Sequence, residues 1–458
     1  MRVFAHKSAS VDLLHGPILR SMLVFATPLF FSSVFQQLYN TMDTIIIGHT
    51  LGDEALAAMG AAGAVYDLLI GFAFGIGNGL AIVTARSYGS SDIKHLKKSV
   101  ASSIVIGGSI TVIITILARF ILYPFLKVLN TPSQIIEQSY AYISTITLFI
   151  VVMFAYNLCA GLLRAIGNSV MPLVFLILSS ILNIVLDLFF IIRLQMGVQG
   201  AAAATVIAQG VSVTACLIYI GRKARILIPG KEHFTLDYAL YKEMLMQGLS
   251  MGFMNCIVSA GTAILQSGIN SLGYLVIAGH TAARKLFQFL LMPFIAMSQT
   301  ISTFVSQNRG AEQIGRIRKA MIYAYLYGAA VAAFVTVCML FLAPAAVRLL
   351  SGSSEQVVIA NGAMYLRVVA PCLAILGILN PTRMGLQAVG QKILPLFSSV
   401  IELIGKSMFV VLLIPRFQYM AVIFCEPVIW CFMIVELLAA FWTDPFIRSG
   451  KGVSEISE

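Results

Sequence analysis

Long apolar stretches, separated by short polar segments, run through most of the sequence. A helix that crosses a bilayer needs about 20 predominantly apolar residues, and twelve stretches reach this length. Several are longer than about 25 residues, so tilted or kinked helices are expected. The pattern predicts membrane-spanning helices at about 18–48, 54–86, 99–123, 135–160, 170–192, 197–221, 244–270, 274–306, 320–345, 357–382, 393–414 and 418–442.

The composition indicates an all-α integral membrane protein. Of the 458 residues, 59% are hydrophobic and 11% are charged, whereas roughly a quarter of a soluble domain is charged. This composition excludes a water-soluble enzyme, a disordered chain and a disulfide-stapled secreted domain. The continuous apolar runs exclude a transmembrane β-barrel, because barrel strands alternate apolar and polar residues.

The positive charge of the chain, formally +11, reports its orientation in the membrane rather than an affinity for nucleic acid. With the N-terminus in the cytoplasm, 21 of the 30 Lys and Arg residues fall in inner segments, five in outer segments and four within spans. Cytoplasmic loops are the ones enriched in Lys and Arg. We therefore expect both termini in the cytoplasm and no nucleic-acid partner.

The two halves of the chain resemble each other. The motif Leu163-x-Ala165-x-Gly167-x4-Pro172 recurs as Leu386-x-Ala388-x-Gly390-x4-Pro395. A polar inner segment at about 222–243 separates six spans from six, so we predict an N-terminal lobe at 1–221, a cytoplasmic linker at 222–243 and a C-terminal lobe at 244–458. Because each half has an even number of spans, the repeats are parallel, as in many transporters that work by alternating access.

Burying a polar residue inside the bilayer costs free energy, so the polar residues of the spans are the candidates for function. In the first span, Asp43 lies about 8 Å below the outer end and shares a helix face with Tyr39 and Asn40. In the fifth span, Asn183 and Asp187 are neighbours at i and i+4, at a similar depth. These residues are expected to converge in the outer half of the N-terminal lobe.

Thr205, in the outer third of the sixth span, falls at the same depth. With it, the group holds two carboxylates that could share a proton, or oxygen ligands that could hold a hard cation such as Na⁺. A structural hydrogen-bond network is the alternative. An ion site is favoured because no basic residue in the N-lobe spans is available to neutralise both acids.

The roles of the other polar groups inside the spans can be interpreted in more than one way. Glu402 and Lys406 are at i and i+4 and are expected to pair with each other. We assign no function to Glu426 or Glu436 from the sequence. Candidates for the substrate cavity are Gln36, Asn40, Asp67, His280 and Arg284. Asp67 could instead join helices by a hydrogen bond, and Arg284 or its neighbour Lys285 could pair with an acid of the C-terminal lobe.

Pro28 lies in the middle of the first span. Proline removes a backbone hydrogen bond and permits a kink, so Pro28 is a candidate conformational hinge, with ordinary packing as the alternative.

The segments Pro28-Leu-Phe-Phe and Phe35-Gln-Gln-Leu-Tyr-Asn-Thr-Met-Asp43, followed by Gly52-x-x-Ala-Leu-Ala-Ala-Met-Gly60, resemble the multidrug and toxic compound extrusion (MATE) family. The repeated Leu-x-Ala-x-Gly-x4-Pro motif is similar to the same family, and the layout of six plus six spans covers essentially the whole chain. The resemblance implies a V-shaped pair of six-helix bundles with a central cavity. It implies export of cationic amphipathic drugs in antiport with H⁺ or Na⁺, from a bacterial or archaeal plasma membrane.

The resemblance also assigns residues. Asp43, Asn183, Asp187 and Thr205 match the cation site of the prokaryotic DinF-like branch, and Asn157 and Tyr39 match its neighbours. Span seven carries Asn255-Cys256 and no acid, so the C-lobe carboxylate site of the NorM-like branch is absent. This departure favours ion coupling in the N-terminal lobe.

Two other functions remain open. A flippase for lipid-linked precursors, in the same MOP superfamily, would use Arg and Lys in its cavity to bind pyrophosphate. A membrane receptor or scaffold would leave the buried acids without a purpose. The sequence contains no P-loop and no Rossmann glycine motif, so we expect an ion gradient to drive transport. We expect a monomer in the lipid bilayer that handles small organic cations, uses no cofactor beyond the coupling ion, and is not an enzyme.

Overall fold

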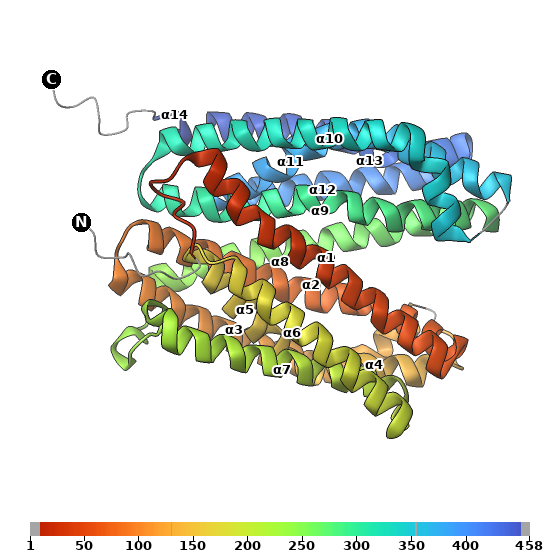
Figure 1. The fold of residues 1–458 in the computed structure, drawn as a ribbon, viewed down its shortest axis with the longest axis horizontal. Coiled ribbons are helices and arrows are strands. Elements are labelled where there is room, and N and C mark those ends of the chain that lie inside the picture. Colours follow the sequence, from red (N-terminus) through yellow and green to blue (C-terminus); the bar gives the residue numbers. More distant parts are fainter. Residues whose placement is uncertain (1–9, 130, 353–354, 450–458) are drawn as a thin grey trace. The chain divides into compact units, whose positions relative to one another are not determined.

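The computed structural model of the chain describes residues 10–129, 131–352 and 355–449. All regular elements in these residues are helices (Figure 1). Three of the basic residues used to orient the chain, Arg2, Lys7 and Lys451, lie outside the described residues.

The chain divides into two compact units by its internal contacts. The first unit comprises Met1–His15 and Thr27–Cys256, and the second comprises Gly16–Ala26 and Ile257–Glu458. The division falls inside two long helices, α1 (Ile18–Leu51) and α8 (Tyr238–Asn270). The predicted linker at 222–243 covers the last two residues of a helix that ends at Lys223, two short 3₁₀ turns with irregular chain around them, and the first six residues of α8.

The first unit contains most of α1, the first part of α8 and the elements between them. In chain order these are α2 (Asp53–Gly89), α3 (Ile93–Val128), α4 (Ile136–Leu148), α5 (Ile150–Ala165), α6 (Val170–Asp187), η1 (Leu188–Arg193), α7 (Gly197–Lys223), η2 (Arg225–Leu227) and η3 (Lys231–His233). Helix α2 packs against α3 and α5, while α7 packs against α5 and α6. The six-residue π-helix η1 continues α6 directly.

The second unit follows the same plan. Its elements after α8 are α9 (Tyr274–Gly310), α10 (Ile314–Ser351), α11 (Gln356–Ala388), α12 (Ile393–Met408), η4 (Phe409–Leu413), α13 (Ile414–Thr443) and α14 (Pro445–Arg448). Helix α11 packs against α9, α10 and α13, and α12 packs against α13. A π-helical segment, η4, again follows the fifth span of the unit.

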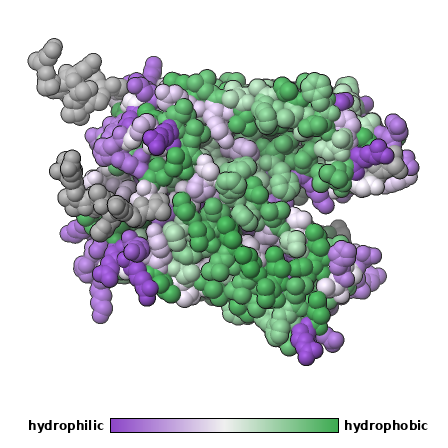
Figure 2. Space-filling view, viewed as in Figure 1, coloured by the Kyte–Doolittle hydropathy of each residue, from purple (hydrophilic) through white to green (hydrophobic). Residues whose placement is uncertain are grey.

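The predicted spans are confirmed by the helices of the described residues. Ten segments are long and apolar enough to cross a membrane, and the bent pair of α4 and α5 makes eleven. One of the ten, Ile393–Thr443, contains two helices, because Gln418 has a non-helical φ of 50°. Figure 2 shows hydrophobic residues over the middle of the visible face and hydrophilic residues toward the helix ends, as a bilayer requires.

The fourth predicted span is bent at a position that no residue of the sequence marks as a bend. Helices α4 and α5 meet at 52° around Phe149. The hydroxyl of Thr115 on α3 donates to the carbonyl oxygen of Thr147 at 3.1 Å, just before the break. A side-chain donor that competes for a backbone carbonyl bends a helix at that point.

The repeat seen in the sequence extends to unusual backbone conformations. Four positions with positive φ in the first half have counterparts 221 or 223 residues later. The pairs are Gly52 and Gly273 (83° and 92°), Ser91 and Glu312 (60° and 56°), Gly167 and Gly390 (87° and 94°), and Gln195 and Gln418 (52° and 50°). Because a positive φ is uncommon for residues with side chains, the four matches show that both halves turn in the same way at the same places.

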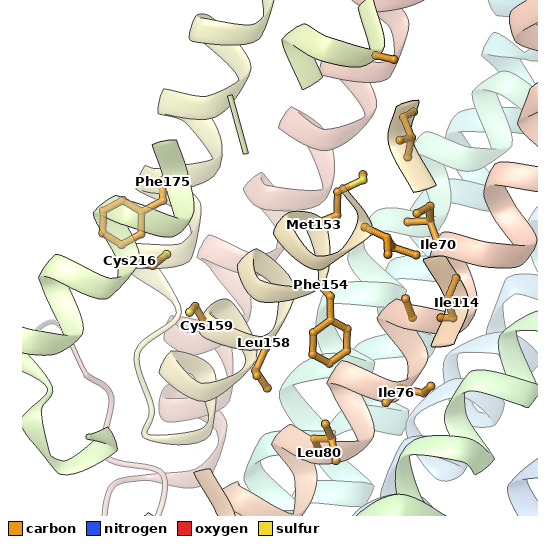
Figure 3. Close-up of a cluster of buried hydrophobic side chains, with 14 of the residues drawn as sticks. Ile70, Ile76, Leu80, Ile114, Met153, Phe154, Leu158, Cys159, Phe175 and Cys216 are labelled. Carbon is orange, nitrogen blue, oxygen red and sulfur yellow. The ribbon is translucent and has the colours of Figure 1, made fainter. Parts of the chain in front are cut away.

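A core of buried apolar side chains fixes the helices of the first unit. Phe154 of α5 lies in this core with Met153, Leu158 and Ile76 (Figure 3). Helix α3 approaches closely at Gly107, where any side chain would collide with the ring of Phe154. The core therefore holds α2, α3 and α5 in the arrangement that supports the polar residues described next.

Candidate functional site

Two buried carboxyl groups of the first unit meet between α1, α6 and α7. Asp43 of α1 is 6% exposed and Asp187, the last residue of α6, is 1% exposed. Asn183, one turn before Asp187, and Thr205 of α7 are also buried. The i, i+4 spacing on α6 directs Asn183 and Asp187 to the same side of the helix, and Asp43 faces them from α1.

The Asn183 amide links the two carboxyl groups. Its nitrogen points toward them, because the opposite orientation would set its oxygen against acceptors only. In this orientation it donates to Asp43 Oδ1 at 2.8 Å and to Asp187 Oδ2 at 3.2 Å. The amide oxygen faces Thr205, whose backbone nitrogen lies 3.2 Å away and whose hydroxyl oxygen lies 3.4 Å away.

Hydroxyl groups surround the two acids. Tyr39 Oη and Thr205 Oγ1 are 3.0 Å apart and share a hydrogen bond, and Tyr39 interacts electrostatically with Asp43. Two further phenols, the partly buried Tyr66 and the buried Tyr142, are within electrostatic range of Asp43. Neither phenol was singled out by the sequence, since each reads as one aromatic residue in an apolar run.

The charge of the site is not balanced by the protein. Asp43 and Asp187 lie on either side of the same amide nitrogen of Asn183, yet neither forms an ion pair with a basic side chain in the described residues. Asp187 Oδ1 is buried and has no hydrogen-bond partner there. Two adjacent buried carboxyls cannot both stay ionised without a compensating charge, so the arrangement can take up a proton or a cation.

The remaining N-lobe candidates lie outside this cluster. Asn157 is buried on α5 beside Gly77 of α2. Among the described residues, no hydrogen bond joins it to the two acids. Gln36 is half-buried on α1, whereas Asn40 of α1 and Asp67 of α2 are exposed. Exposed polar groups on these two helices are available to a ligand, and among the described residues no hydrogen bond or ion pair joins them to the cluster.

Pro28 lies inside α1, which continues through it as one helix. The division between the two compact units falls at Ala26 and Thr27, directly before this proline. Pro28 therefore stands where α1 passes from one unit to the other.

The two C-lobe candidates belong to the second unit. Arg284 of α9 donates to Glu426 Oε2 of α13 at 2.8 Å and to Tyr365 Oη of α11 at 3.1 Å. His280, one turn earlier on α9, is buried, and its Nδ1 lies 3.2 Å from Tyr419 Oη. The expectation that Arg284 or Lys285 pairs with an acid is confirmed for Arg284.

The ion pair of Arg284 is the end of a longer chain of charges, here called the C-lobe network: Arg284, Glu426, Lys406, Glu402 and Arg383. Lys406 Nζ lies 3.6 Å from Glu426 and 2.9 Å from Glu402, so the predicted pairing of Glu402 with Lys406 is confirmed. Glu402 also lies 3.7 Å from Arg383 of α11. Apart from Arg284, the network is almost entirely buried.

Glu426 is the functional candidate that the sequence missed. It is 142 residues from Arg284 along the chain, so no local spacing relates them. The available signal was an acid inside an apolar run, which in a membrane helix is costly unless it is paired.

A comparison with protein families detects the same repeat of the two halves of the chain. A family model described as MatE matches residues 28–189 and matches again at residues 251–412. The second match begins 223 residues after the first, which is the offset of the later repeated turns.

Individual relatives agree with this match. The chain is 25% identical over 299 residues to "Probable multidrug resistance protein YpnP" of Bacillus subtilis, covering 65% of this chain and 67% of that protein. It is 23% identical over 434 residues to "Multidrug export protein MepA" of Staphylococcus haemolyticus, covering 93% and 92%. The fold is similar to a solved "Outward-facing conformation of a multidrug resistance MATE family transporter of the MOP superfamily", with a TM-score of 0.85, 22% identity, and coverage of 95% and 98%.

Proposed function

The chain belongs to the MatE family of transporters, and from this premise we propose that it exports amphipathic organic cations in exchange for H⁺ or Na⁺ held at Asp43 and Asp187. It is a multidrug efflux transporter of the membrane and not an enzyme, as its family and its relatives named for multidrug export indicate. The cationic substrate, the coupling ion and the residues that bind it are the content of the proposal.

One observation carries the proposal: two carboxyl groups are buried side by side without a basic partner in the described residues. Such a pair has a strong affinity for a positive charge, because burial penalises each ionised carboxylate and the two repel each other. A proton or a small cation satisfies both needs. The unpartnered oxygen of Asp187 offers a position for either.

The orientation of Asn183 favours a proton in this conformation. Its N–H groups face the carboxyl oxygens, and a cation would be repelled by donors at that position. For Na⁺ to bind, the amide would turn its oxygen inward, where it would join the oxygens of Asp43, Asp187 and Thr205 as hard ligands. Both ions therefore fit the residue set, with Asn183 in different orientations.

Ion binding would be coupled to transport through α1. Uptake of a proton or Na⁺ removes buried charge between α1 and α6, so the two helices can pack differently when the site is filled. Pro28 interrupts the hydrogen bonds of α1 and is the natural place for the helix to bend. The exposed Asn40 and Asp67, with the half-buried Gln36, are the polar groups of the first unit that an organic cation would meet.

The test is dye efflux in membrane vesicles, with pH and Na⁺ gradients imposed separately. Asp43→Asn and Asp187→Asn should each abolish gradient-driven export of ethidium at unchanged protein levels. Asp53→Asn, an exposed acid at the start of α2, is the matched control and should transport normally. Wild-type rates in both site variants would show that the pair is structural and that the coupling ion binds elsewhere.

The orientation of the chain is part of the proposal. The bias of basic residues places both termini and the 222–243 segment in the cytoplasm. In a cysteine-free background, Lys231→Cys should resist a membrane-impermeant maleimide in intact cells and react in inverted vesicles. Labelling in intact cells would reverse the orientation.

A further inference from the structure

A groove lies in the second unit between α10 and α11, near the C-terminal end of α10 and the N-terminal end of α11. It has a volume of about 470 Å³, which is typical of sites for small ligands. Pro344 lines it on α10, and the residues that line it on α11 extend from Gln356 to Val368. Since a helix rises about 1.5 Å per residue, the groove follows α11 for about 18 Å.

Arg367 stands in this groove and bonds to a backbone carbonyl that a proline has freed. Pro344 has no N–H, so the carbonyl oxygen of Leu340, four residues earlier, lacks its usual donor in the helix. Arg367 Nε donates to this oxygen at 3.2 Å. The described residues record no hydrogen bond from Nη1 or Nη2 of Arg367, and the side chain is exposed. Four of the five N–H donors of the guanidinium are therefore open to a ligand.

The positive charge of the groove has no counterpart in the protein. A neutral amide could supply the hydrogen bond to Leu340, whereas a charge inside a membrane span is costly and marks a ligand site or an ion pair. In the part of the chain that the structure describes, no carboxylate lies within 4 Å of the Arg367 guanidinium. Arg348, exposed on α10 one turn after Pro344, forms no ion pair there either. The groove therefore favours an anion.

The position of the groove along α11 places it at the level of lipid headgroups. Helix α11 has 33 residues and is about 50 Å long, whereas the hydrocarbon core of a bilayer is about 30 Å thick. Centred on the bilayer, the helix extends about 10 Å beyond the core at each end. Gln356 begins the helix, and Arg367 lies about 16 Å further along it. Arg367 is thus about 6 Å inside the core edge, a depth from which an arginine extends its charge to the headgroup layer.

An apolar surface continues from the groove toward the middle of the bilayer. Phe334, Val337 and Phe341 of α10 are exposed, and they share one face of the helix with Pro344, at i, i+3, i+7 and i+10. Because α10 ends beside the groove, these three residues lie deeper in the membrane than the groove does. Acyl chains that hang from a headgroup in the groove would lie against this face. A cationic drug would instead be repelled by Arg367.

We propose that this groove binds the headgroup of an anionic phospholipid, with the phosphate on the Nη groups of Arg367 and the acyl chains along the apolar face of α10. Guanidinium and phosphate form strong, charge-assisted hydrogen bonds. Phosphatidylglycerol is favoured over phosphatidylcholine, because the choline group brings a positive charge of its own. In the orientation proposed above, the lipid belongs to the outer leaflet. Failure of this lipid site would leave the proposed export of cations untouched.

The experiment measures lipid preference at the groove by the quenching of tryptophan fluorescence with brominated acyl chains. The two native tryptophans, Trp430 and Trp442, are replaced by phenylalanine. Phe341→Trp then reports on the groove, and Phe120→Trp on α3 reports on another lipid-facing surface; the two positions are 77% and 74% exposed. The full-length protein is reconstituted in phosphatidylcholine mixed with brominated phosphatidylglycerol or with brominated phosphatidylcholine.

Phosphatidylglycerol should be preferred about fivefold at the Phe341→Trp reporter, the factor that one basic residue gives near an anionic lipid, and less than about twofold at the Phe120→Trp reporter. Arg367→Gln should reduce the first preference to the second, because the amide can still donate to Leu340 but has no charge for the phosphate. Arg119→Gln, at an exposed arginine of α3 that also makes one side-chain hydrogen bond, is the matched control and should not change the preference at the groove.

A second variant tests the space of the groove without changing its charge. Ala360 lines the groove and is exposed, so Ala360→Phe fills the groove while Arg367 stays in place. The preference at the Phe341→Trp reporter should again fall below about twofold. A preference of about fivefold that survives either Arg367→Gln or Ala360→Phe overturns the inference, as does its absence from the unsubstituted groove. If Arg367→Gln does not fold, the Ala360→Phe result decides alone.

Tetraphenylphosphonium, a colourless lipophilic cation, tests whether the groove holds an organic cation instead. It should leave quenching by brominated phosphatidylglycerol unchanged, because Arg367 repels it. Relief of the quenching would make the groove a drug site and overturn the lipid assignment. If the tryptophan-free background does not fold, native mass spectrometry of the chain with its own tryptophans replaces quenching. Arg367→Gln, unlike Arg119→Gln, should then lose one bound phosphatidylglycerol, and its retention would overturn the inference.

Discussion

The C-lobe network predicts that two neutralising substitutions in one ion pair differ sharply in cost. In Lys406→Met, both carboxylates keep an arginine, since Glu426 remains 2.8 Å from Arg284 and Glu402 remains 3.7 Å from Arg383. In Glu402→Gln, Lys406 keeps Glu426 as its carboxylate partner in the network, and buried Arg383 loses its nearest carboxylate. The first change leaves two cations and two anions in the network, whereas the second leaves three cations and one anion.

The magnitudes follow from this charge count. Stranding a buried charge by removing its partner costs about 3–5 kcal/mol of unfolding free energy, and Arg383 is 7% exposed. Replacing the Lys406 ammonium by an apolar side chain of similar length loses its hydrogen bonds but also the cost of burying it. We expect a loss of about 0–2 kcal/mol. The two variants should therefore differ by at least about 2 kcal/mol.

Unfolding in mixed micelles titrated with dodecyl sulfate measures the difference. The two tryptophans of the chain, Trp430 and Trp442, both lie on α13, so their fluorescence reports on the second unit. The double variant, Glu402→Gln with Lys406→Met, should not recover the stability of Lys406→Met, because Arg383 is stranded in both variants that lack Glu402. Equal losses in the two single variants would refute the charge count and show that the pair acts in isolation.

Three further predictions concern the first unit. Gly107→Ala should lower the unfolding free energy by about 1–3 kcal/mol, because its Cβ would collide with a buried phenylalanine ring. Gly108→Ala, which meets nothing within 4 Å, is the control and should be neutral or stabilising in the same titration. The backbone N–H of Leu240 hydrogen-bonds to Asp237 and holds the pKa of this carboxyl below its ordinary value; Asp237→Asn should therefore destabilise the protein at neutral pH, and its difference from wild type should vanish as pH falls through the carboxyl range. Pro28→Ala should stabilise α1 by up to about 3 kcal/mol while slowing dye efflux in vesicles; efflux at the wild-type rate would remove Pro28 from the mechanism.

The sequence predicted the helices and the N-lobe cluster because both depend on local spacing. Hydropathy marks each span independently of its neighbours. Asn183 and Asp187 share a helix face at i and i+4, and their depth matches that of Asp43. Three helices that cross the same bilayer place residues of equal depth at equal height, so few arrangements keep these groups apart.

Other features depend on contacts that spacing does not encode. The bend at Phe149 involves a hydroxyl on another helix, that of Thr115, and the sequence has no proline or glycine at the break. Glu426 acquires its role only through Arg284 on α9 and Lys406 on α12. The orientation of the Asn183 amide, on which the proposed choice between a proton and Na⁺ depends, likewise follows from its neighbours rather than from its position.

The repeated turns have an evolutionary consequence. Gly167 and Gln195 flank α6 as Gly390 and Gln418 flank α12, each 223 residues later, so Asn183 and Lys406 occupy the same place in two copies of one ancestral segment. The two copies share their backbone turns, while the side chain at this place is a neutral amide in one and an ammonium in the other. One copy now gathers acids that lack a cation, and the other carries cations of its own. With this difference the halves are no longer interchangeable, and the proposed function loads the coupling ion in one lobe alone.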